Sequence, residues 1–189
     1  MTFNGKDVVE LELKGQKASV FIIKDAISNQ VYRLQSEGKI LEGDVAFRKD
    51  GTAYVTNGSV TERGPNGTVT LTTYQNNRIL QRQIVGDNTH IDIYGIEGRP
   101  VSYNRDDTIR EGIIENFTQG TRTVVTQDTL RVERYDVTAN PYGRDGKRSY
   151  FFYQPGNVIQ YEVYDRNTGI KKEEGLYWSI DHAQPRIVI

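Results

Sequence analysis

Ile159-Gln160-Tyr161-Glu162-Val163-Tyr164 runs directly into Asp165-Arg166-Asn167-Thr168-Gly169, and this stretch decides the fold class. In its first part, apolar or aromatic residues alternate with polar ones, so an extended strand would have one apolar face. Its second part is rich in Asp, Asn and Gly, which tolerate the positive φ of tight turns. A strand followed by such a turn predicts a β-hairpin. A calcium loop is not predicted, because no bidentate Glu follows at the required offset.

The same pattern recurs along the chain. Period-2 alternation is found again in residues 9–13, 68–72, 91–93 and 176–180. Turn signals separate the strands, among them residues 49–51, 57–58, 64–67 and 75–77. The turns follow one another too closely for the crossover helices of a parallel sheet. The sequence therefore predicts an all-β fold of many short hairpin-connected strands: an antiparallel sandwich, a barrel or an extended meander.

One segment has the marks of a helix. Asp25 can cap it, Gly38 can end it, and the apolar residues between them recur at helical spacing. We therefore predict at most one short helix, over about residues 25–37. The competing interpretation is a turn at residues 28–30 followed by a strand over residues 31–34.

The length of 189 residues fits one domain, or at most two small ones, and no stretch of the sequence reads as a convincing domain boundary. We therefore predict a single all-β domain over residues 1–189. Residues 138–147, which contain Pro141, Gly143 and Gly146, are expected to form a long polar loop. Residues 70–78, 92–101 and 162–171 each have a Tyr and turn-forming residues within strand-like sequence, and so resemble the hairpin repeats of MORN-type proteins. Most of the glycines that mark those repeats are missing, so no family is assigned. The resemblance would imply an elongated sheet used for contacts.

Composition excludes several classes of function. The chain has no cysteine, so thiol catalysis, cysteine zinc sites and disulfides are excluded. The 24 basic and 25 acidic residues nearly cancel, so a nucleic-acid partner is not expected. No apolar run is long enough to span a membrane as a helix. The first residues, MTFNGKDVVELELKG, lack the apolar core of a signal peptide, so the default location is the cytoplasm or a virion.

No catalytic, cofactor or metal site is predicted. The two histidines, His90 and His182, have no metal-ligand spacing and no plausible triad, and His90 is expected to be solvated beside Asp92. The densest acidic cluster is expected to consist of turn residues and a solvated strand face; it comprises Asp106, Asp107, Glu111 and Glu115. No Gly-rich phosphate loop leads into a helix, and no cofactor is expected.

The stretch richest in recognition chemistry is residues 131–153. Arginine and lysine interleave there with tyrosine, and both Arg and Tyr are common anchors of protein interfaces. The candidate interaction surface comprises Arg131, Arg134, Tyr135, Tyr142, Arg144, Lys147, Arg148 and Tyr150. We therefore expect a non-catalytic structural or interaction protein. Its partners would be other protein chains in a homo- or hetero-oligomer, as in a phage particle or a bacterial surface structure.

Two alternatives stay open at the level of sequence. In the first, the sheet closes into a β-barrel around a small apolar or amphipathic ligand, with Phe151, Tyr153, Tyr161 and Trp178 lining the pocket. In the second, the protein is a carboxylate-based carbohydrate-active enzyme. The first requires a closed sheet, and the second requires carboxylates from different strands to converge.

Overall fold

A computed structural model describes residues 2–3, 7–14, 17–134, 158–178 and 186–188. Side chains are described for residues 20–134 and 159–176. The chain divides into two compact units, residues 1–87 and 88–189. The expectation of one domain over residues 1–189 stays a prediction. The expected loop at residues 138–147 lies outside the described residues.

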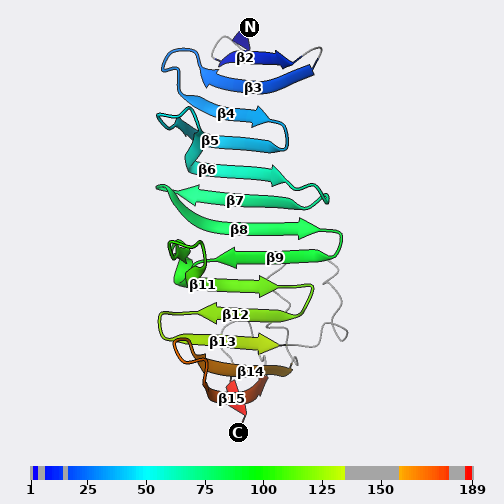
Figure 1. Cartoon of the computed structure of the whole chain (residues 1–189), viewed down its shortest axis with the longest axis vertical. Coiled ribbons are helices and arrows are strands. Elements are labelled where there is room, and N and C mark those ends of the chain that lie inside the picture. The colour runs from blue at the N-terminus through cyan, green and yellow to red at the C-terminus, as the bar shows by residue number, and fades with distance from the viewer. Residues whose placement is uncertain (1, 4–6, 15–16, 135–157, 179–185, 189) are drawn as a thin grey trace. The chain divides into compact units, whose positions relative to one another are not determined.

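The first unit is an antiparallel meander in which each strand pairs with the next along the chain (Figure 1). Its strands are β1 (Thr2–Phe3), β2 (Asp7–Lys14), β3 (Lys17–Asp25), β4 (Val31–Ser36), β5 (Lys39–Phe47), β6 (Ala53–Arg63), β7 (Val69–Gln75) and β8 (Arg78–Gly86). Its buried core lies on β4, β5 and β6 and consists of Leu34, Leu41, Val45, Val55 and Val60. Within each strand these residues lie on one face, because side chains alternate between the two faces of a strand. β-bulges adjust this spacing where the strand register shifts.

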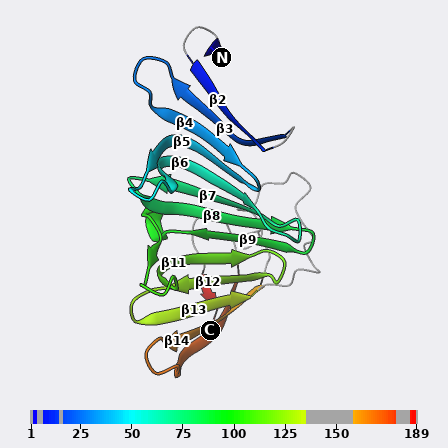
Figure 2. The ribbon, with the colours of Figure 1, turned by 45° about the horizontal axis from the view of Figure 1, so that its top comes forward.

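The second unit is also a meander (Figure 2). Its strands are β9 (Thr89–Tyr94), β10 (Ser102–Tyr103), β11 (Ile109–Asn116), β12 (Thr121–Val125), β13 (Thr129–Arg134), β14 (Val158–Asp165), β15 (Lys171–Trp178) and β16 (Arg186–Val188). The pairing order is β9, β11, β12, β13, β14, β15 and β16, and β10 pairs with β11 outside this order. The all-β prediction is thus confirmed as an open meander. Among the described strands, neither meander closes into a barrel.

The helix expected at about residues 25–37 is wrong, and the turn and strand occur instead. Asp25 does cap backbone N–H groups, since its Oδ1 accepts from Ile27 and Ser28 at 3.0 and 2.7 Å. These bonds close a hairpin loop rather than a helical turn, because Asn29 has a φ of 57°. Strand β4 then pairs with both of its neighbours and buries Leu34. Burial in the sheet outweighs the helical spacing of a few apolar residues.

The β14–β15 turn is built in the same way as the β3–β4 turn. Asp165 Oδ1 accepts the N–H groups of Asn167 and Thr168 at 3.0 and 2.9 Å. Gly169 has a φ of 71°, in the place that Asn29 takes in the first turn. The hairpin predicted at residues 159–169 is therefore confirmed, and its geometry follows from an Asp at the first position and a residue that tolerates positive φ at the fifth.

The turn expected at Asn57 and Gly58 is wrong, because both residues lie inside β6. Gly58 has a φ of 133° and stands directly opposite Gly43 of β5. The Asn57 side chain ties neighbouring strands together: it donates to Asp44 Oδ2 and accepts the N–H of Asn76, both at 2.9 Å. The Asn57-Gly58 pair therefore marks a β-bulge in the long strand β6. A bulge, like a tight turn, is a position that favours glycine.

Candidate functional site

A row of charged side chains crosses the second unit. Asp92 stands opposite Glu115, Glu115 opposite Arg122, and Arg122 opposite Glu133, on four neighbouring strands. Directly opposed residues in an antiparallel sheet point to the same face. Three of these side chains are carboxylates and are buried: Asp92 is 5%, Glu115 9% and Glu133 3% exposed. We call these four residues the charged row.

Internal partners hold the carboxylates of the charged row. Arg122 lies between two of them, with Nε 3.5 Å from Glu115 Oε1 and Nη1 3.2 Å from Glu133 Oε2. Glu133 receives a second guanidinium, since Arg131 Nε donates to its Oε1 at 2.8 Å. Glu115 accepts the hydroxyl of Tyr94 at 2.6 Å. Buried charges require pairing of this kind to be tolerated.

Burial also perturbs ionisation in the charged row. Burial is the largest cause that raises the pKa of Glu115 above its usual value, against the hydrogen bond from Tyr94 and the positive charge of Arg122. Asp92 and Glu133 add to the rise by repulsion. Burial beside Glu115 likewise raises the pKa of the Tyr94 hydroxyl, which therefore stays protonated and available as a donor.

These residues correct the sequence-based interpretation of the polar face. Glu115 was expected on a solvated face, and His90 was expected to be solvated, but Glu115 is buried and the His90 side chain is only 17% exposed. His90 lies 4.7 Å from the ring of Phe117 and 3.6 Å from Asp92. The sheet register places the four residues of the charged row side by side on one face, where opposite charges pair and their burial is tolerated. His182 lies outside the described residues.

Asp106 and Asp107 are turn residues, as predicted, whereas Glu111 is half-buried on its strand. Asp106 caps the turn before β11, where its Oδ1 accepts from the Thr108 hydroxyl and N–H. Asp107 takes the positive φ of that turn, at 62°. Glu111 is on β11 opposite Ser102. No group of three or more His, Asp or Glu side chains that could hold a metal ion is found among the described residues.

The candidate interaction surface is described only at its first two residues. Arg131 and Arg134 point to opposite faces of β13. Arg131 joins the side of the charged row and stacks over the ring of Tyr161, 4.1 Å from its centre. Arg134 pairs with Glu162. The remaining members lie outside the described residues, namely Tyr135, Tyr142, Arg144, Lys147, Arg148 and Tyr150.

The side chains expected to line a barrel are not brought together as a pocket. Tyr161 is 3% exposed, and its hydroxyl donates to Glu173 Oε1 at 2.7 Å. Its ring lies on Gly175, directly opposite on β15, where an added Cβ would come within 2.8 Å of the ring. Tyr161 thus packs as part of the sheet. Phe151, Tyr153 and the side chain of Trp178 lie outside the described residues.

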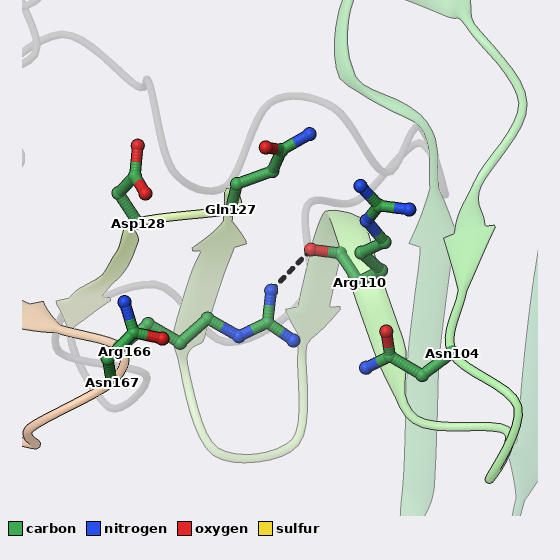
Figure 3. Close-up of a pocket in the computed structure, with 6 residues that line it drawn as sticks. All are labelled: Asn104, Arg110, Gln127, Asp128, Arg166 and Asn167. Atoms are coloured by element: carbon green, nitrogen blue, oxygen red, sulfur yellow. Dashed lines mark hydrogen bonds between the residues drawn. The ribbon is translucent and has the colours of Figure 1, made fainter.

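A polar pocket lies at an edge of the second unit where three turns meet (Figure 3). Its volume is about 430 Å³, and it is lined by Asn104, Arg110, Gln127, Asp128, Arg166 and Asn167. These residues come from the β10–β11 turn, the start of β11, the β12–β13 turn and the β14–β15 turn. We call it the turn pocket. Sequence reasoning missed it, since its residues are scattered over more than 60 positions and no motif unites them.

An insertion places one wall of the turn pocket. Between β9 and β11 the meander is interrupted by a 3-10 turn, η1 (Ile96–Gly98), and by β10. Gly95 allows the chain to fold back there, because an added Cβ would lie 1.5 Å from the carbonyl oxygen of Arg99. Val101 is buried and packs on Gly112 of β11. The insertion thereby brings Asn104 beside the first residues of β11.

Arg166 joins the three turns. Its Nη1 donates to the carbonyl oxygen of Arg110 (Figure 3) and to that of Thr126, and its Nη2 donates to that of Ile109 at 2.8 Å. Its own N–H donates to the carbonyl of Asp128 at 2.9 Å. One planar guanidinium thus fixes β11 and the β12–β13 turn relative to the β14–β15 turn.

Arg166→Ala should therefore lower the free energy of unfolding by about 1–3 kcal/mol, because three carbonyl groups lose their donor. Urea unfolding followed by tryptophan fluorescence measures this loss. Asn167→Ala is the control in the same turn, and it should change the free energy by no more than about 0.5 kcal/mol. Equal stabilities of the two variants would show that Arg166 does not hold the turns together.

Glu115→Gln tests the ionisation of the charged row. The pKa of Glu115 is raised in the folded state, so above pH 4.5 the carboxyl group keeps its proton longer in the native protein than in the unfolded chain. The contribution of this group to the free energy of unfolding therefore falls as pH rises through that range. The amide removes this dependence. We therefore expect the variant to be more stable relative to wild type at about pH 7 than at about pH 4. A difference that is constant with pH would contradict a raised pKa.

Comparisons with known protein families, curated proteins and solved structures find no match to this chain. No helix among the described residues is long and apolar enough to cross a membrane.

Proposed function

We propose that this chain is a non-catalytic interaction protein that serves as a component of a larger assembly, such as a phage particle or a bacterial surface structure. One observation carries the proposal: the carboxylates of Glu115 and Glu133, which have the burial typical of catalytic groups, are held by partners inside the fold. Groups bound in this way stabilise a scaffold. A long meander of hairpins is suited to presenting contacts along its surface.

A carboxylate-based hydrolase is the second candidate, and one observation favours it: Glu115 and Glu133, from different strands, converge on Arg122. Glycoside hydrolysis, however, needs a sugar between the two carboxylates. Arg122 occupies that position, and only 12% of the Glu115 side chain and 4% of the Glu133 side chain are exposed. The geometry therefore favours a structural ion-pair network.

The contact surface is proposed to lie in residues 135–150. Arg131 and Arg134 are already engaged with Glu133, Tyr161 and Glu162, so they contribute to the fold. The sequence supplies further cationic and aromatic anchors in Tyr142, Arg144, Lys147, Arg148 and Tyr150. Planar Arg heads and rigid Tyr rings form directed contacts at a low entropic cost.

Reversing the charge at two of these anchors tests the proposal. We expect Arg144→Glu combined with Arg148→Glu to weaken assembly by about tenfold or more while the fold persists, because both cationic anchors are lost. Sedimentation velocity over a range of concentrations, with and without the native partner, measures assembly. The control, Lys49→Glu with Arg78→Glu, makes the same change in charge at exposed residues of the first unit. Equal assembly of both variants and wild type would refute a contact role for this stretch.

A further inference from the structure

The turn pocket has the size of a small-molecule site, but its lining is wholly polar, unlike the mostly apolar lining of most such sites. Its volume of about 430 Å³ lies within the range of roughly 300–1,000 Å³ that such sites occupy. All six lining side chains are polar or charged, and none is aromatic. Such a lining disfavours an apolar ligand, which would leave these polar groups without hydrogen-bond partners. It also lacks the aromatic ring on which the apolar face of a neutral sugar could stack.

The charges of the turn pocket favour an anionic group. Arg110 and Arg166 carry two positive charges against one negative charge on Asp128. No ion pair joins either arginine to another of the described residues. Arg166 donates its hydrogen bonds to backbone carbonyl groups, which are neutral and so leave its positive charge uncompensated. Because a guanidinium has five N–H donors, Nε–H and one N–H of Nη2 are left for a ligand.

The remaining polar groups require the ligand to donate as well as accept. The carboxylate of Asp128 is an acceptor only, so it repels a ligand that carries nothing but acceptors. Gln127 and Asn167 each offer amide donors and an acceptor. Asn104 uses its amide nitrogen to donate to Thr108 Oγ1 at 2.9 Å, which leaves its oxygen as an acceptor. Hydroxyl groups, which both donate and accept, match this set.

We propose that the turn pocket binds an acidic saccharide unit, a sugar that carries a carboxylate and several free hydroxyl groups. The carboxylate pairs with Arg110 and with the remaining donors of Arg166. The hydroxyl groups bind Asp128 and the three amides. The turn pocket contains no residue of the proposed contact stretch at residues 135–150, so the two proposals can be tested separately.

Titration of the full-length protein with glucuronate, followed by isothermal calorimetry and amide chemical shifts, tests the proposal. We expect saturable binding of glucuronate, with shifts centred on the turns that line the pocket. Glucose lacks the carboxylate and should bind about tenfold more weakly or worse. Inorganic phosphate should not compete, since it offers few donors to Asp128.

Arg110→Gln provides the test by mutation. The Arg110 side chain is exposed and makes no hydrogen bond to another of the described residues, so this variant should fold as wild type does. Its affinity for glucuronate should fall about tenfold or more. Arg105→Gln removes an exposed arginine from the β10–β11 turn that does not itself line the pocket, and should leave affinity unchanged.

Several results would overturn the proposal. They are the absence of saturable glucuronate binding to wild type, phosphate binding as tight as glucuronate binding, and glutamate binding tighter than glucuronate binding. The last would indicate an amino-acid site. Unchanged affinity in Arg110→Gln, or an equal loss in Arg105→Gln, would also overturn it, since the ligand would then lie elsewhere or respond only to net charge.

Discussion

Glu133→Ala should lower the free energy of unfolding of the second unit by about 3–5 kcal/mol. Glu133 is 3% exposed and accepts ion pairs from Arg122 and Arg131, at 3.2 and 2.8 Å. Its removal takes one shared partner from Arg131 and from Arg122, whose side chain is only 17% exposed. Breaking a buried ion pair costs more than the pair itself contributes, because the remaining charge loses its compensation. Chemical unfolding of the purified variant measures the loss.

Two controls separate burial from charge. Glu42 stands opposite Arg33 and pairs with it at 2.9 Å, but its side chain is 47% exposed, so Glu42→Ala should cost at most about 1 kcal/mol. Glu133→Gln keeps the shape and removes only the charge, and it should be nearly as damaging as Glu133→Ala. If Glu133→Ala costs no more than Glu42→Ala, the charged row does not hold the unit together.

Gly43→Ala and Gly58→Ala should each destabilise the first unit by about 3–5 kcal/mol, the sum of backbone strain and overpacking. The two glycines stand opposite each other on β5 and β6. A Cβ on Gly43 would lie 2.2 Å from the carbonyl oxygen of Asn57, and one on Gly58 would lie 2.0 Å from that of Glu42. Both residues also have positive φ, at 109° and 133°. Backbone atoms cause the clash, so no side-chain movement relieves it.

Gly67→Ala is the matched control. Gly67 has a φ of 74°, but no atom lies within 4 Å of the position of an added Cβ. It should therefore show only the cost of positive φ, about 1–2 kcal/mol. Thermal unfolding of the three variants gives the comparison. Equal losses in all three would show that the close approach of β5 and β6 contributes nothing.

The fold class follows from local sequence because a hairpin is a local structure. Alternation in residues 159–164 and the Asp165 turn define strand, turn and strand without distant information. Prediction fails where one residue type serves two roles. The Asn57-Gly58 pair is a frequent turn signal, yet here Gly58 permits a close strand approach. Asp25 caps a hairpin loop with the hydrogen bonds that it would also make at a helix start.

The charged row and the turn pocket could not be predicted in the same way. Alternation shows which residues share a face, but it does not show which face is covered. Glu115 and Glu133 are polar members of their strands, and only the register that places Arg122 between them explains their burial. The turn pocket depends on Arg166 reaching a strand 56 residues away in sequence. An arginine in a turn gives no sequence signal for such a contact.

Both features fit a protein that works by binding. The charged row stabilises a sheet, and the turn pocket keeps two cationic groups available at its edge. We propose that the contact stretch, residues 135–150, carries the interaction with other chains.

Cross-linking of the assembled protein through its lysines tests this account most directly. Lys147 lies within the proposed contact stretch, whereas Lys171 and Lys172 lie on β15, outside it. The account predicts that intermolecular cross-links, identified by mass spectrometry, are concentrated at Lys147 and decline when Arg144→Glu and Arg148→Glu are combined. A protein that gives no intermolecular cross-links at its working concentration, or whose cross-links avoid Lys147, would contradict it.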